Sequence, residues 1–435
     1  MSQLFPALPL RAAAVAAMCV AALPQSALAT NGYFSHGYGV NSQAVAGVGI
    51  ALPQDGLTAA TNPAGTAFTG NRLDVGANLF KPSRGAEITG NSAALPDGNG
   101  GTFTTSLNGK YNGDGRELFL IPEFGYTRQI NPQLSVGLAV YGNGGMNTSY
   151  NTSPFQGFGV TQATKMNLEQ LFISPSVAWK ATPDHVFGAA LNLAHQRFSM
   201  RGIQPFAGAS ASPLDVSNRG TDSSSGAGIR LGWIGQITPE LRLGATWSSK
   251  IQGRFDKYKG LFAEQGGFDI PANYGVGLAW QPAQHWTLGL DYQVIELNDV
   301  KSVGNPLSQL TFQGQPLGST NGPGFGWKDV KVVKLGVIHQ LNDAWTLRAG
   351  YSHATQPIPK SETFLNILAP GVVQDHLTAG FTWKTSANSE WSAHYSHAFE
   401  KTVKGSGAIP ANFGGGDANI RLKEDIIGVS YGWKF

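Results

Sequence analysis

The stretch Ile427-Gly428-Val429-Ser430-Tyr431-Gly432-Trp433-Lys434-Phe435 occupies the last positions of the chain. Large apolar or aromatic residues alternate in it with small or polar ones. In an extended strand, successive side chains point to opposite faces, so the first set shares one face and the second set the other. A strand with one apolar face and one small or polar face is typical of the wall of a β-barrel in the bacterial outer membrane.

The same alternation recurs from about residue 71 onward. It is clearest at 134–140, 241–247, 286–294 and 345–351, where apolar residues interleave with glycine, serine, threonine or charged residues. This period of two predicts strands that keep one face apolar. The last strand also resembles the C-terminal signal that the barrel-assembly machinery reads, so we expect that machinery to be a partner during biogenesis.

Short and long connections alternate between these segments. Six are short and rich in turn-forming residues, at 131–133, 182–184, 238–240, 281–284, 342–344 and 385–389. Seven are long, at 82–115, 142–165, 204–224, 256–271, 304–328, 358–373 and 404–418. Six hairpins plus a first and a last strand predict an all-β fold, a transmembrane antiparallel β-barrel of about 14 strands over residues 71–435.

The composition agrees with strands that face lipid. Only 13% of the residues are charged, about half of the roughly 25% found in soluble domains, and no apolar run reaches the ~20 residues of a spanning helix. Most of the tryptophans lie near a short turn or the C-terminus, which is typical of an aromatic girdle at one membrane interface: Trp179, Trp280, Trp286, Trp345, Trp383, Trp391 and Trp433. A soluble β-sandwich would bury its tryptophans in mid-strand.

Residues 1–29 predict a cleaved secretory signal peptide. Arg11 precedes the apolar run from Ala12 to Leu23, and Ala27-Leu28-Ala29 matches a small-x-small cleavage site. The single cysteine, Cys19, lies in this segment, so we expect no thiol chemistry in the mature protein.

Residues 30–70 do not alternate and are rich in glycine. A barrel of 14 strands is wider than the eight-strand type that its own side chains fill. We therefore predict that this segment forms a hatch, or plug, inside the lumen.

Several motifs resemble FadL-type outer-membrane transporters of long-chain fatty acids and other hydrophobic compounds. Asn31-Gly32-Tyr33-Phe34, the small residues 44–51, and Asp55 followed by Asn62-Pro63-Ala64-Gly65 are similar to the hatch of that family. The step Val140-Tyr141-Gly142-Asn143-Gly144-Gly145, expected to end the third strand, is similar to its kinked third strand. The resemblance implies capture of fatty acids or aromatic hydrocarbons at the long loops and lateral release beside Gly142, Gly144 and Gly145.

Apolar side chains in two long loops are candidates for substrate binding. They are Ile203, Phe206 and Leu214 in the third loop, and Leu261, Phe262 and Phe268 in the fourth. Such residues often form a small local core, but the resemblance favours a ligand groove. Arg197 and Arg201, near the outer end of a strand, either pair with a ligand carboxylate or face solvent, and an uncharged arene needs neither.

No motif indicates catalysis, a cofactor or a metal. The phosphate-binding loop and the dinucleotide fingerprint are missing from the sequence, and Gly428-Val429-Ser430-Tyr431-Gly432, which has the spacing of a nucleophile elbow, lies within the last expected strand and not at a strand-to-helix turn. A formal net charge of +3 without a basic run argues against nucleic acid. We expect a monomer in the outer membrane of a Gram-negative bacterium, with a hydrophobic small molecule, outer-membrane lipid and lipopolysaccharide as partners. A general diffusion porin, a lipid hydrolase and a surface adhesin or phage receptor are the alternatives.

Overall fold

The computed structural model describes residues 31–435. Fourteen long strands form an antiparallel sheet that closes into a barrel, because β17 pairs with β1 from Arg72↔Lys434 to Thr89↔Asp417. The wall strands are β1 (Arg72–Thr89), β5 (Phe119–Asn131), β6 (Leu134–Tyr150), β7 (Thr164–Lys180), β8 (His185–Arg201), β9 (Asp222–Thr238), β10 (Leu241–Ser248), β11 (Asn273–Ala283), β12 (Trp286–Ile295), β13 (Val330–Gln340), β14 (Trp345–Ala354), β15 (Asp375–Lys384), β16 (Ser389–Val403) and β17 (Asp417–Lys434). The prediction of a 14-stranded all-β barrel is confirmed. The predicted signal peptide, with Cys19, lies outside the described residues.

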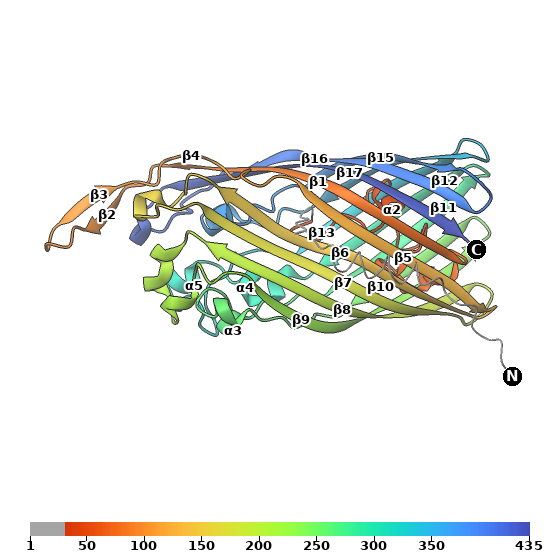
Figure 1. Cartoon of the computed structure of the whole chain (residues 1–435), viewed down its shortest axis with the longest axis horizontal. Helices are drawn as coiled ribbons and strands as arrows, with labels where there is room; N and C mark the ends of the chain where they lie inside the picture. Colours follow the sequence, from red (N-terminus) through yellow and green to blue (C-terminus); the bar gives the residue numbers. More distant parts are fainter. Residues whose placement is uncertain (1–30) are drawn as a thin grey trace.

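The two ends of the barrel differ. All six predicted short turns lie at the end that carries the C-terminus, and the long loops lie at the other, which is the extracellular end in barrels of this kind (Figure 1). One loop forms the projecting hairpin of β2 (Ala93–Pro96) and β3 (Thr102–Thr105), while β4 (Gly109–Asn112) extends the sheet beside the outer end of β1. The remaining loops hold short helices: α3 (Ala263–Gly266), α4 (Lys301–Gly304), α5 (Ser308–Thr311), η3 (Gln156–Phe158), η4 (Gln204–Ala209), η5 (Pro213–Asp215), η6 (Asp256–Tyr258), η7 (Leu297–Asp299), η8 (Lys360–Glu362), η9 (Leu365–Ile367) and η10 (Ala411–Phe413).

Some strands run further outward than the sequence pattern predicts. The expectation that the third wall strand ends at the glycine step is wrong, because β6 continues to Tyr150. It stays paired with β7 across a bulge, with Gly142 opposite Leu171 and Gly144 opposite Gln170. Asn143 is the extra residue. A bulge of this kind shifts the side-chain alternation by one, so the pattern of 134–140 does not continue beyond it.

The wall has one apolar face. Along β8, Phe187, Leu191 and Leu193 are 42–49% exposed, whereas the alternate residues Asn192 and Phe198 are buried. The exposed set therefore points outward, where lipid covers it in the membrane. No helix within residues 31–435 is long and apolar enough to cross a membrane.

The N-terminal segment, residues 31–70, lies inside the ring of strands (Figure 1). It contains α2 (Val40–Gln43), η1 (Thr58–Ala60) and η2 (Pro63–Ala67). Its backbone is held by wall side chains from opposite sides of the barrel: Val40 N donates to Glu123 of β5, Ala46 N to Thr378 of β15, and Gly49 N and Ile50 N to Asp291 of β12. The wall thus supplies the hydrogen-bond partners that a buried irregular segment needs.

Candidate functional site

An apolar pocket, here called the loop pocket, lies among four of the long loops. Its lining comes from the end of β8 and from the loops that follow β8, β10, β12 and β14: Met200, Ile203, Phe206, Leu261, Phe262, Ser302, Leu317, Pro323, Gly324, Phe325, Leu365 and Leu368. None of these side chains is charged. A pocket of this composition suits an apolar compound, because removing apolar surface from water is favourable and no ionic group has to be desolvated.

Four of the six predicted loop residues line this pocket: Ile203, Phe206, Leu261 and Phe262. Phe268 is fully buried directly behind it, with its ring centroid 4.8 Å from that of Phe262. Leu214 is 84% exposed and does not join the lining.

Arg197 and Arg201 do not join the loop pocket either. On β8 they alternate with Phe198 and Met200, which are buried in the interior cluster, so the arginine side chains point out of the wall. Arg197 lies 3.5 Å from Glu169 of β7 as an ion pair. An outward position is incompatible with pairing a ligand carboxylate beneath the loop pocket.

A chain of aromatic rings runs inward from the loop pocket. Phe268 contacts Phe262 on the pocket side and Tyr33 of the N-terminal segment on the other, with 6.2 Å between the ring centroids of Phe268 and Tyr33. Tyr33 in turn packs against Trp327 at 6.1 Å. Apolar side chains therefore fill the interior continuously between the extracellular loops and the start of the N-terminal segment.

The chain of rings ends where the wall pairing is interrupted. The β5–β6 ladder stops at Phe124↔Val140, although both strands continue outward beyond this pair. Part of the free edge of β6 is paired by the N-terminal segment: Gly145 N donates to Tyr33 O at 2.9 Å, and Ser35 N donates to Asn143 O at 3.0 Å. Gly144 is required there, since a Cβ would overlap the carbonyl oxygen of Tyr33.

Amide side chains link this edge to the loops. Tyr38 donates to Asn143, Asn143 to Gln170, Gln170 to Gln196, and Gln196 to the carbonyl of Phe268, at 2.8–3.1 Å. All three amides are buried. This amide ladder crosses β6, β7 and β8 and fixes the bulge residue Asn143 between the N-terminal segment and the wall of the loop pocket.

A second pocket, the wall pocket, lies inside the barrel beside the free edge of β6 and has a mixed lining of apolar and charged residues. It is lined by Phe80, Pro82 and Arg84 of β1, Gly145, Met146 and Asn147 of β6, Ala369–Gly371, and Leu422 and Glu424 of β17. Phe80 also packs against Phe119 and Ile121 of β5. Apolar side chains thus line the interior on the β5 side of the interruption as well.

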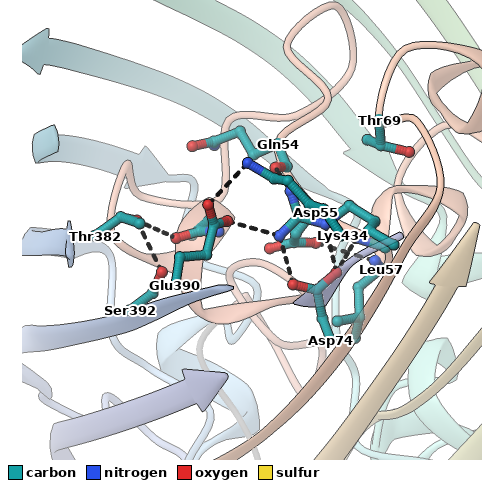
Figure 2. Close-up of polar contacts among 12 residues, drawn as sticks. Gln54, Asp55, Leu57, Thr69, Asp74, Thr382, Glu390, Ser392 and Lys434 are labelled. Atoms are coloured by element: carbon teal, nitrogen blue, oxygen red, sulfur yellow. Dashed lines mark hydrogen bonds and ion pairs between the residues drawn. The ribbon is translucent and has the colours of Figure 1, made fainter. Parts of the chain in front are cut away.

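Polar groups close the opposite, turn-bearing end. Arg72 donates to Asp74 and Glu390, Lys434 donates to Glu390, and Arg348 bridges Gln54 and Thr382. Figure 2 shows Asp74, Glu390 and Lys434 of the wall gathered around Gln54 and Asp55 of the N-terminal segment. We call this group the polar floor. Buried, paired charges form a poor environment for an apolar molecule, because the molecule would have to displace hydrogen bonds that it cannot replace.

The predicted hatch motifs both contact the wall. Tyr33 and Phe34 lie against the edge of β6, and Asn31 forms a bridge to Phe34. At the other motif, Asn62 caps η2 by accepting from Ala64 N and donates to Trp233 O of β9. Gly32 belongs to the first of these turns, and Pro63 and Gly65 belong to the second. A Cβ added at Gly32 would lie 3.2 Å from the ring of Trp327.

Sequence reasoning missed the contributions of the other two loops and of the amide ladder. Phe325, Leu365 and Leu368 follow β12 and β14, and nothing local relates them to Phe206. Gln170 and Gln196 could have been recognised from the sequence, because each is a polar residue on the inward face of a long strand. Within residues 31–435, no three His, Cys, Asp or Glu side chains are grouped so that they could hold a metal ion.

Comparisons with known proteins agree with this architecture. Residues 26–435 match the family model "Outer membrane protein transport protein (OMPP1/FadL/TodX)". A Pseudomonas aeruginosa FadL homologue aligns over 93% of this chain and 100% of its own, with 17% identity and a TM-score of 0.69. The Pseudomonas putida toluene transporter TodX aligns over 92% and 99%, with 17% identity and a TM-score of 0.65.

The Ralstonia pickettii toluene transporter TbuX also aligns over 92% of this chain and 99% of its own, with 17% identity and a TM-score of 0.60. A search of curated proteins found no match. The chain is an outer-membrane β-barrel that belongs to the OMPP1/FadL/TodX family of transport proteins.

Proposed function

We propose that this protein takes up hydrophobic compounds, long-chain fatty acids or aromatic hydrocarbons, through the outer membrane. The cargo binds first in the loop pocket, and the N-terminal segment serves as a hatch that keeps the lumen closed to water. The observation that carries the proposal is the uninterrupted apolar interior from Phe262 through Phe268 and Tyr33 to the free edge of β6.

The cargo leaves sideways, between β5 and β6 beside Gly142, Gly144 and Gly145. Two features support this route over an axial one. The wall pairing is interrupted at this point, and the polar floor lies across the axial route to the periplasm. An apolar chain that crossed water would lose ~0.8 kcal/mol for each exposed methylene, so a route from apolar pocket to membrane is favoured.

The test compares two leucines of the predicted capture loops. Leu261 lines the loop pocket, whereas Leu214 is exposed and lies outside it. We expect Leu261→Ser to weaken binding of an apolar ligand about tenfold, as the loss of one to two buried methylenes implies, and to slow uptake at low ligand concentration. Leu214→Ser is the matched control. Equal binding by the two variants would refute capture at this pocket.

The same binding assay distinguishes the two classes of cargo. A monoaromatic hydrocarbon and a long-chain fatty acid are titrated against both variants, and a deletion strain is grown on each as carbon source. Because the lining carries no charge, it suits an aromatic hydrocarbon, or the hydrocarbon tail of a fatty acid, better than the carboxylate group of a fatty acid. A general porin would instead pass small hydrophilic solutes and conduct ions, which measurements in planar bilayers would detect.

A further inference from the structure

A polar groove lies on the outside of the barrel, at the outer ends of β6, β7 and β8. Arg116, Lys165, Arg197 and Arg201 line it together with one acidic residue, Glu169, so its charged residues sum to +3. Asn147, Asn167, Ser199 and Thr221 supply further polar groups. We propose that this groove binds the phosphate groups of lipopolysaccharide, the anionic glycolipid of the outer leaflet.

The height of the groove fits this ligand. On β7 the outward-facing residues are apolar from Trp179 to Leu171 and become polar at Glu169. On β8 the apolar series ends at Leu193, and Arg197 follows four residues later. At about 3.3 Å per residue, the first cation lies roughly 13 Å along the strand from the apolar belt. Because strands of such barrels tilt by about 35–45°, this corresponds to about 10 Å along the membrane normal, outside the hydrocarbon core on the side of the polar headgroups.

The arrangement of the cations calls for an external anion. Lys165 and Arg201 are directly opposite each other in the β7–β8 ladder. Like charges in that position are destabilising by themselves. Within residues 31–435, neither has a carboxylate within ion-pair distance. Lys81, Lys110, Lys250 and Lys259, in contrast, each pair with an acidic residue.

Several cations around one groove favour a multiply charged ligand. A phosphate offers three strong acceptor oxygens and more than one negative charge, and arginine and lysine side chains are the usual partners of phosphate in proteins. A cargo carboxylate carries a single charge, and Arg197 is already paired with Glu169. The groove therefore suits a phosphorylated lipid better than a departing fatty acid.

The groove also borders the interrupted part of the wall. Asn147 and Ser149, which line it, belong to the stretch of β6 beyond the last β5–β6 pair. A lipid held here would stand beside the stretch of β6 between Gly145, which pairs with Tyr33, and Ser149, which pairs with Gly113 and Gly115, and would stabilise the outer ends of the strands that frame it. This role concerns the lipid bound outside the barrel and does not depend on the cargo inside.

The test measures lipid binding by the full-length protein in detergent, by native mass spectrometry titration. The probes are bisphosphorylated lipid A, the same lipid without its phosphates, inorganic phosphate and a long-chain fatty acid. We expect the Lys165→Gln/Arg201→Gln double variant to bind the bisphosphorylated lipid about 25-fold more weakly, since each basic residue at an anionic lipid surface contributes roughly fivefold. The control is Lys81→Gln/Lys110→Gln, which removes the same charge from paired outer positions.

Three outcomes would overturn the assignment. In the first, both double variants bind bisphosphorylated lipid A as the wild type does. In the second, removal of the lipid phosphates leaves wild-type affinity unchanged. In the third, inorganic phosphate or the fatty acid displaces the lipid at comparable concentration, which would make the groove a site for a free anion or for cargo. Uptake assays are independent of all three, so a failure here is distinguishable from a failure of the transport proposal.

Discussion

Replacing Gly144 with alanine should release the start of the N-terminal segment from the wall. The added Cβ would overlap the carbonyl oxygen of Tyr33 and would come within 2.9 Å of its carbonyl carbon and 3.0 Å of Phe34 Cα. Backbone atoms on both sides leave no flexible side chain to move aside. The two chains must separate, and the hydrogen bonds Gly145 N to Tyr33 O and Ser35 N to Asn143 O are lost.

Each buried backbone hydrogen bond contributes about 1 kcal/mol net, so the docking of residues 33–35 should weaken by about 2 kcal/mol. This corresponds to an increase of roughly 30-fold in the population of the undocked form. Ser35 is only 5% exposed. Because Cys19 lies in the predicted signal peptide, Ser35→Cys introduces the single thiol of the mature chain and reports undocking by its rate of reaction with a water-soluble maleimide.

The Ser35→Cys thiol is measured in three backgrounds: wild type, Gly144→Ala and Gly208→Ala. The last is the matched control, because a Cβ at Gly208 meets no atom within 4 Å. We expect labelling about 30 times faster in Gly144→Ala only, with the heat-modifiable mobility of the folded barrel unchanged in all three. Equal labelling rates in the two alanine variants would refute the argument that contact with β6 holds this part of the segment.

Three further predictions concern the interior. Deleting Asn31–Ala67 should leave a folded barrel that conducts ions in a planar bilayer, and a deletion variant as non-conducting as the intact protein would contradict the hatch. Burial and the adjacent Asp74 carboxylate raise the pKa of Asp55 from 3.8 to about 6. The folded state therefore binds this proton more tightly than the unfolded one, and the free energy of unfolding should fall as the pH rises from about 4 to about 6. Asp55→Asn should remove that part of the pH dependence in thermal melts, and unchanged slopes would show that Asp55 is not the group responsible. Gln170→Leu leaves the Asn143 and Gln196 amides without their partner and should lower stability by about 2–4 kcal/mol, whereas Leu171→Met, on the outward face, should change melting by less than about 1 kcal/mol.

The wall was predictable because lipid imposes a strict rule on it. Outward residues such as Leu138 and Leu288 must be apolar, while their neighbours face the interior, so the alternation survives in the sequence. At Asn143 the rule fails. The bulge adds a residue to β6 and exchanges the two faces, and the glycines on either side imitate the start of a loop. Neither effect is visible without the partner strand.

The site was predictable only in part, for a related reason. Phe206 and Phe262 were recognisable as apolar residues in loops that should be polar. Their partners Phe325 and Leu365 come from loops more than 50 residues away in the chain, and only the closed barrel brings the four loops together. The outward position of Arg197 was readable from the period of two along β8, because Arg197 is in phase with the outward residues Leu191 and Leu193.

The position of the N-terminal segment constrains how the molecule can be assembled. The segment is synthesised before any strand, yet Ala46 hydrogen-bonds to Thr378, 332 residues later, and the seam that encloses it joins the first strand to the last. Contacts between residues so far apart in sequence form late, because loop closure opposes them. A sheet that zipped shut along β1 and β17 first would leave no way in for a folded segment from the side. The growing sheet therefore has to curl around residues 31–70 before the seam of β1 and β17 closes.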